Sequence, residues 1–148
     1  MMSVSALAAA KAVCEMRGWT LSNLALQKIL YIAHMFHLAM TGKPLINEEF
    51  EAWDYGPVVP EVYRRVRAFG SDPIRNVFHW EPALERDTTE YQALKAAADA
   101  TNGMSPASLV AFTHSPKGAW SRCYKPNVRG ITIPNELILD EYRARKSK

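Results

Sequence analysis

One stretch, residues 21–40, constrains the fold of this 148-residue chain more than any other feature. Its apolar side chains recur at helical spacing on two faces rather than one. The first face carries Leu26, Ile29, Leu30, Ala33, Phe36 and Met40, and the second carries Leu24, Tyr31, Met35 and Leu38. Only a narrow polar stripe of Asn23, Gln27, His34 and Thr41 remains. A helix that is apolar nearly all round lies inside its domain, so we predict that other helices pack around it.

Capping signals place the ends of this helix and of five others. Thr20 is the expected N-cap of the central helix, and Gly42 is its expected end. Further helices are predicted over residues 5–17, 60–70, 87–103, 105–115 and 135–146. Their start signals are Pro60, an Asp87 and Glu90 pair with capping-box spacing, and Ser105 before a proline.

Extended structure has only two short candidates. Residues 49–55 alternate with period two, and Gly56 and Pro57 are expected to end that strand. Residues 131–133 form the second candidate, and residues 117–130 are expected to be a loop. Residues 71–85 have no sustained period, which leaves a loop and a short irregular hairpin as alternatives. The predicted fold class is therefore mainly α: a single compact helical domain, residues 1–148, around a central buried helix with a small β element.

Composition and cysteine content exclude several classes of protein. The chain is 48% hydrophobic and 22% charged, which is typical of soluble globular domains and not of disordered chains. No apolar run reaches the roughly 18 residues of a membrane span, and the first residues lack the pattern of a signal peptide, so we expect a cytoplasmic protein with no membrane contact. Cys14 and Cys123 are expected to be reduced, with Cys14 buried.

The net charge of +3 is distributed unevenly. Residues 1–116 carry 10 Lys and Arg against 12 Asp and Glu, whereas residues 117–148 carry 8 against 3. Such a basic end can attract nucleic acid. However, Arg143, Arg145, Lys146 and Lys148 also suit the C-terminus of a solvated helix, which we favour, so nucleic acid is not the expected partner.

The sequence predicts no catalytic, metal or cofactor site. His34 and His37 could share one metal, but two ligands do not make a closed site, and core histidines are the favoured interpretation. A run of Glu48, Glu49, Glu51 and Asp54 is interpreted as a solvated strand edge. The rival hypothesis is a small hydrolase that uses His114 with Ser115, or His34 with a carboxylate.

One segment, residues 53–67, brings together the residue types that dominate binding hot spots. Aromatic side chains flank a Gly-Pro break, and arginines follow at helical spacing. The candidate partner-binding residues are Trp53, Tyr55, Pro57, Val58, Tyr63, Arg64 and Arg67. By composition alone, a buried tryptophan on a strand followed by a helix start explains the segment equally well.

Several short motifs resemble the Panacea domain of SocA-like and phage-associated bacterial proteins. They are Leu26-Gln27-Lys28-Ile29-Leu30-Tyr31, His37-Leu38, Thr41-Gly42-Lys43-Pro44-Leu45, Glu51-Ala52-Trp53 and Tyr55-Gly56-Pro57-Val58-Val59-Pro60-Glu61-Val62-Tyr63. The resemblance is densest over residues 26–70, and its best-matching core is residues 20–120. A weaker similarity follows at Thr113-His114-Ser115 and Trp120, which adds His114 and Trp120 to the candidate binding residues.

The resemblance implies a mostly helical bacterial antitoxin that neutralises a cognate protein toxin by direct contact, in the manner of a type II system. Some relatives act as adaptors that deliver the toxin to an AAA+ protease of the ClpXP type, so the resemblance leaves this second mode of action open. It also leaves self-association open. It implies no enzyme activity and no cofactor.

Overall fold

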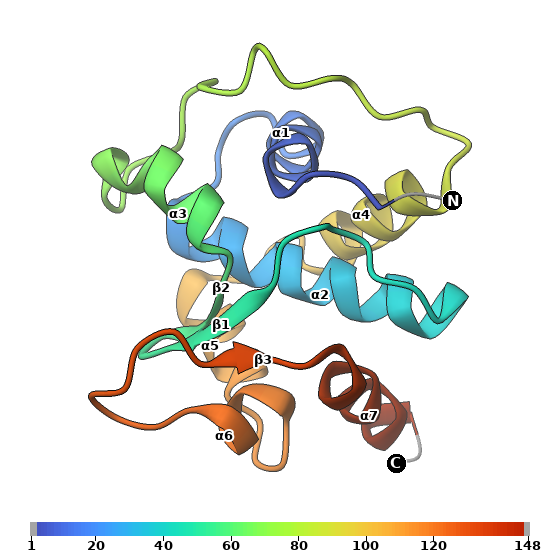
Figure 1. Cartoon of the computed structure of the whole chain (residues 1–148). Coiled ribbons are helices and arrows are strands. Elements are labelled where there is room, and N and C mark those ends of the chain that lie inside the picture. The colour runs from blue at the N-terminus through green and yellow to red at the C-terminus, as the bar shows by residue number, and fades with distance from the viewer. Residues whose placement is uncertain (1–2, 147–148) are drawn as a thin grey trace.

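The computed structural model describes residues 3–146, and its centre is α2 (Asn23–Thr41) (Figure 1). Helices α1 (Ala6–Met16) and α4 (Thr89–Ala100) contact one side of α2, and α7 (Asn135–Lys146) contacts the other. Most residues of α2 are buried. The prediction of a central helix surrounded by other helices is confirmed.

The end of α2 agrees with the sequence prediction, but its beginning does not. Gly42 adopts a left-handed conformation with φ 74°, and its N–H donates to the carbonyl of Leu38. The N-cap is Ser22, whose hydroxyl accepts from the Ala25 N–H at 3.3 Å. Thr20 instead donates its hydroxyl to the carbonyl of Arg17 at 2.7 Å, so its prediction as the cap was wrong.

The remaining long helices begin at or near the predicted residues. α3 (Pro60–Val66) starts with its proline and continues into a short 3-10 helix, η1 (Arg67–Phe69). α5 (Pro106–Thr113) is capped by the hydroxyl of Ser105, as predicted. α4 is capped by Thr88 rather than by Asp87, because the Thr88 hydroxyl accepts from the Tyr91 N–H.

A three-stranded antiparallel sheet lies beside α2. Its order is β2 (Gly56–Val58), β1 (Phe50–Trp53) and β3 (Thr132–Ile133). Trp53 pairs with Gly56 in the register, so only Asp54 and Tyr55 connect the first two strands. Gly56 and Pro57 were expected to break the strand, whereas they begin its partner strand in a tight hairpin.

The predicted loop at residues 117–130 contains a short helix, α6 (Ala119–Cys123). Gly118 offers no side-chain cap, and the Ala119 N–H donates instead to the Glu141 carboxylate of α7 at 2.9 Å. Because this cap comes from a distant part of the chain, local sequence signals do not reveal it. Residues 71–85 have neither helix nor strand, so of the two alternatives left by the sequence the segment is a loop and not a hairpin, and it arches over α1 (Figure 1).

A contiguous hydrophobic core surrounds α2 on all sides. Leu30 has no exposed surface, whereas Phe36 is only partly buried and contacts the ring of Tyr142 edge-on. Phe36 therefore lies at the margin of the core rather than within it. Cys14 is buried and unpaired, as predicted, and burial raises the pKa of its thiol to about 12. Within residues 3–146, no helix is long and apolar enough to cross a membrane.

Candidate functional site

A buried lysine lies beneath the β1–β2 hairpin. Lys28 of α2 has no exposed surface, and its Nζ donates to the carbonyl of Pro57 at 2.9 Å. Burial lowers the pKa of this amine to about 7. None of the ion pairs among residues 3–146 involves Lys28. Lys28 was not among the site residues predicted from the sequence. Its position among Leu24, Tyr31 and Ile32 at helical spacing was nevertheless a detectable signal of burial.

The side chain of Gln27 attaches the hairpin to α2 next to this lysine. Its Oε1 accepts from the Val59 N–H at 2.9 Å, and its Nε2 donates to the Asn23 side chain at 3.1 Å. Both Asn23 and Gln27 are buried. The polar stripe predicted on α2 therefore faces other parts of the chain, not solvent.

Gly56 allows the hairpin to approach Lys28 closely. Its φ of 113° lies in a region that favours glycine. A Cβ at this position would lie 2.9 Å from Oγ1 of Thr113 and 3.0 Å from Cε of Lys28. Both backbone conformation and packing therefore require glycine here, which fixes the hairpin on α2 and α5.

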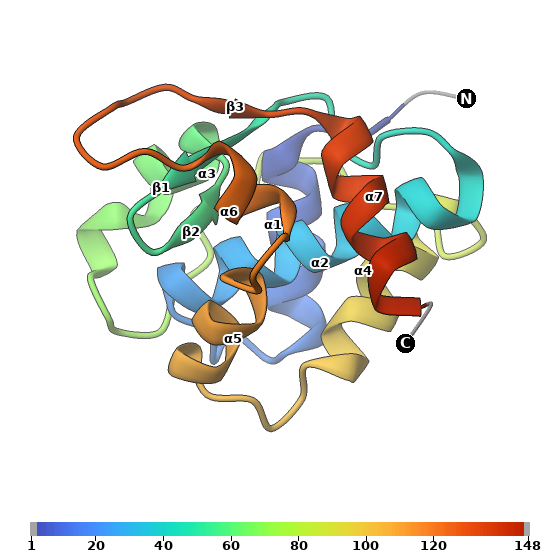
Figure 2. The same ribbon diagram turned by 90° about the horizontal axis from the view of Figure 1, so that it is seen from below.

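Behind the hairpin, three rings form a stack. His114 lies parallel to Trp120 with ring centroids 3.7 Å apart, and Trp120 stacks on Tyr124 at 4.6 Å. Nε1 of Trp120 donates to the carbonyl of Trp53 at 2.7 Å, and the hydroxyl of Tyr124 donates to Asp54. Figure 2 shows α6, which carries Trp120, between the hairpin and α7. The stack holds the hairpin from the side opposite α3.

In front of the hairpin, aromatic side chains remain partly open. Trp53 and Tyr63 are half-buried and contact edge-on with centroids 4.8 Å apart, and Nε1 of Trp53 donates to Glu51 at 3.0 Å. Tyr55, at the tip of the hairpin, is 69% exposed. Arg64 and Arg67 are exposed on the adjoining α3 and η1. We call Trp53, Tyr55, Tyr63, Arg64 and Arg67 the partner face.

A hollow of about 710 Å³ opens between the partner face and the beginning of α2. Five of the sequence-predicted residues line it: Trp53, Tyr55, Val58, Tyr63 and Arg67. The hollow also borders the first turn of α2, Lys28, and Met104 and Pro106 at the start of α5. The structure thus brings together residues from distant segments that the sequence analysis had not connected.

The other predicted residues lie elsewhere around the hairpin. Pro57 and Val58 are buried in β2, so Pro57 supports the hairpin and offers no surface to a partner. Trp120 is only 8% exposed, and with His114 it supports the hairpin from behind. Arg64 is exposed on α3 and does not line the hollow. For Pro57, Trp120 and His114, contacts in the fold explain the pattern that suggested a binding role.

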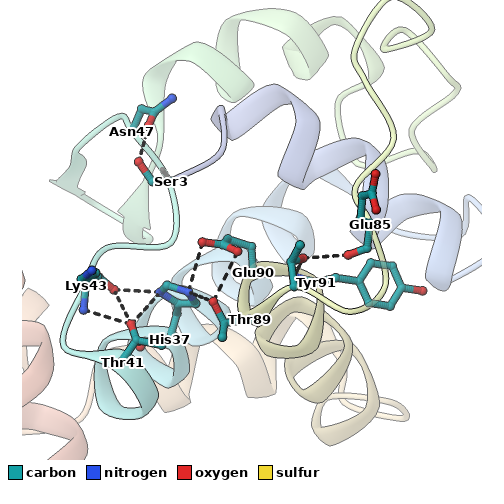
Figure 3. A network of polar contacts seen from close by, with 10 residues as sticks. Ser3, His37, Thr41, Lys43, Asn47, Glu85, Thr89, Glu90 and Tyr91 are labelled. Carbon is teal, nitrogen blue, oxygen red and sulfur yellow. Dashed lines mark hydrogen bonds and ion pairs between the residues drawn. The ribbon is translucent and has the colours of Figure 1, made fainter. Parts of the chain in front are cut away.

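The histidines of α2 are held in structural hydrogen bonds. His37 is buried, with Nδ1 at 2.8 Å from the Lys43 carbonyl and Nε2 at 2.9 Å from Oγ1 of Thr89 (Figure 3). Glu90 lies 3.5 Å from the same Nε2. His34 contacts Asn135 at 2.8 Å, and its burial lowers its pKa to about 4. The interpretation of both as core histidines is confirmed.

The hydrolase hypothesis finds no support in the geometry around His114. Ser115 contacts the carbonyl of Pro116, and no hydrogen bond joins its hydroxyl to His114 in the described part of the chain. Burial, followed by the charge of Lys28, lowers the pKa of His114. Nor do His, Cys, Asp and Glu residues form a group of three suited to a metal anywhere in residues 3–146.

One basic side chain of the C-terminal helix, Arg145, makes contacts within the fold. Arg145 forms an ion pair with Glu141 at 2.6 Å, donates to the carbonyl of Phe112 and lies over its ring. Its interpretation as part of a solvated end was therefore wrong, whereas Arg143 and Lys146 are exposed as predicted. Lys148 lies outside the described residues.

Exposed aromatic and cationic side chains around a hollow are features typical of protein-binding surfaces. Residues 26–121 match the family described as antitoxin SocA-like, Panacea domain. The chain is also 35% identical over 139 residues to antitoxin SocA of Caulobacter vibrioides (strain NA1000 / CB15N), an alignment that covers 85% of this chain and 74% of that protein. The chain therefore belongs to the antitoxin SocA-like, Panacea-domain family. No solved structure matches it.

Proposed function

We propose that this chain is a cytoplasmic antitoxin that neutralises a cognate protein toxin by holding it in a stoichiometric complex, without performing chemistry. Membership of the antitoxin SocA-like family supports the antitoxin role. The partner face is the proposed contact surface. The observation that carries this assignment is the exposure of Tyr55 at the hairpin tip, next to Trp53, Tyr63 and the two arginines.

The physical basis for this surface is the rigidity of its support. The hairpin is attached to α2 through Gln27 and Lys28, and to α6 through the Trp120 side chain. A rigid aromatic anchor loses little conformational freedom on binding, so more of its contact free energy contributes to affinity. Replacement of a hot-spot aromatic residue by alanine typically costs at least about 2 kcal/mol of binding free energy.

The test uses the product of a small, otherwise lethal open reading frame next to the gene for this chain. We expect Tyr55→Ala to weaken binding of that protein at least about thirtyfold and to reduce protection of cells that express it. Binding is measured by calorimetry with purified proteins, and folding of each variant is checked by thermal unfolding.

The matched control is Trp80→Ala. Trp80 is 91% exposed and belongs to the irregular segment of residues 71–85, which arches over α1 (Figure 1). Removal of this exposed aromatic should leave both affinity and protection unchanged. Parental binding and protection by folded Tyr55→Ala protein would reject the partner face as the contact surface, and loss of binding only in the Trp80→Ala protein would move the surface to that segment.

A further inference from the structure

The hollow beside the partner face has an unbalanced charge. Arg17 and Arg67 border it, whereas Asp54 is the only carboxylate residue among its lining residues. Neither arginine takes part in an ion pair within residues 3–146. Arg17 donates to the carbonyl of Ala98 and to the Thr101 hydroxyl, which are neutral acceptors. Lys28 also borders the hollow, but it is fully buried and its lowered pKa favours the neutral amine, so the two arginines supply the excess positive charge.

The beginning of α2 adds to this positive potential. Residues Ser22, Asn23, Leu24 and Ala25 all line the hollow. The N-terminal end of a helix carries a partial positive charge, and its first N–H groups have no acceptor within the helix. α2 has 19 residues, so this effect belongs to a long, well-formed helix. This partial charge has the same sign as the charges of Arg17 and Arg67.

The walls of the hollow are apolar and aromatic. Leu21 and Leu24 of the α2 region, Trp53 and Tyr63 of the partner face, and Met104 before α5 all contribute. Such walls suit the aliphatic stems of side chains in an extended peptide, whereas the cations suit carboxylates at its ends. A volume of about 710 Å³ is large enough for several side chains.

We propose that the hollow receives an acidic segment of the toxin, with at least one carboxylate directed toward Arg67 and the beginning of α2. This inference rests on the proposed function and specifies the chemistry of the partner at the same site. Asp54, whose carboxylate already accepts from Tyr124, leaves the excess positive charge in place. A basic or purely apolar segment would leave these cations without counter-ions inside a contact from which water is excluded.

The test compares Arg67→Glu with Arg86→Glu. Both arginines are exposed, and both substitutions change the charge by the same amount, but Arg86 belongs neither to the partner face nor to the lining of the hollow. We expect Arg67→Glu to weaken binding of the toxin at least about tenfold and to flatten the salt dependence of association, since it places like charges opposite each other. Arg86→Glu should change the affinity by less than about threefold.

A charge-swap experiment identifies the toxin residue. Each Asp and Glu of the toxin is replaced in turn by Lys, and each variant is titrated against the parent and the Arg67→Glu protein. A toxin variant that binds the Arg67→Glu protein better than it binds the parent confirms the inference and names the contacting carboxylate.

Other outcomes overturn the inference and separate it from the proposed function. Equal losses in the two arginine variants would show that the overall charge of the chain, and not an arginine at the hollow, governs binding. Unchanged binding by Arg67→Glu, together with weak binding by Tyr55→Ala, would leave the partner face intact and reject an acidic occupant. If every one of these variants binds the toxin with the same affinity as the parent protein, both proposals are rejected.

Discussion

At the scale of single residues, Lys28 is the most unusual group in the chain. A buried ammonium loses its hydrating water, and the single Pro57 carbonyl does not replace the lost hydrogen bonds. The neutral amine is therefore favoured in the folded state. In the unfolded chain, a lysine has a pKa of about 10.4. Between pH 7 and about pH 10.4, this lysine is mostly protonated in the unfolded chain and mostly neutral in the folded chain. The contribution of Lys28 to the free energy of unfolding therefore rises with pH over this range.

Lys28→Met should remove this pH dependence. The variant keeps a similar side-chain length without an ionisable group, although it leaves the Pro57 carbonyl without its donor. We expect the stability difference between variant and parent to move in favour of the parent as the pH rises from 7 to 9, by at most about 1.4 kcal/mol per pH unit. Urea unfolding of both proteins at several pH values measures it.

The comparison with the variant is necessary because other buried groups titrate in the same range. The raised pKa values of Cys14 and Tyr31 lower the stability of both proteins at alkaline pH, and this effect cancels in the difference. A stability difference that stays constant from pH 7 to 9 would mean that the lysine keeps an ordinary pKa in the folded chain.

At the scale of elements, Glu141 connects three helices. Its Oε1 accepts from the hydroxyl of Tyr31 on α2 at 2.7 Å and from the Ala119 N–H of α6 at 2.9 Å. Its Oε2 accepts from Arg145 one turn along α7 at 2.6 Å. The carboxylate is buried, and four donated hydrogen bonds replace its lost hydration. It thereby fixes the positions of α6 and α7 relative to α2.

Glu141→Gln should weaken this connection. The amide has one acceptor oxygen instead of two, and its NH2 group would face at least one donor, so we expect a loss of about 2 kcal/mol or more in the free energy of unfolding. Hydrogen exchange should also accelerate in α6 and α7 before it does in α2.

Glu136→Gln is the control on the same helix. Glu136 is exposed in the first turn of α7, where neutralisation costs only about 0.5 kcal/mol through the helix dipole. A similar loss of stability in both variants would show that the overall charge of α7, and not the buried contacts of Glu141, determines the free energy of unfolding.

At the scale of the whole molecule, stability depends on the core around α2. Leu30 has no exposed surface and belongs to the central hydrophobic cluster, whereas Phe36 lies at its margin. Leu30→Ala should therefore cost roughly 2 to 5 kcal/mol, because it leaves a cavity that the surrounding helices cannot fill. Phe36→Ala should cost less, about 1 to 2 kcal/mol, since part of the ring is already in contact with water.

Thermal and urea unfolding of both variants measure these losses. Because α2 contacts most other elements, we expect Leu30→Ala to lower a single cooperative transition rather than to release one segment. A midpoint for Leu30→Ala that equals the parental value would contradict the central position of α2.

The sequence by itself determined the α-helices of residues 3–146 other than α6, the position of the central one and the family. Capping residues such as Ser105 and Gly42, and apolar spacing over residues 21–40, act within a few positions of the chain, so they can be read locally. The motifs over residues 26–70 were sufficient to predict the family that residues 26–121 match.

Only the tertiary structure decided which side chains are exposed around the hollow and which support the fold. Pro57 and Trp120 had the composition of a binding surface, but they are buried by contacts with Lys28 and the Trp53 carbonyl, which are 29 and 67 positions away in the chain. The hollow, the cap of α6 and the burial of Lys28 likewise depend on pairs of distant segments. Spacing within one segment carries no information about such pairs, because burial depends on what the rest of the chain places against it.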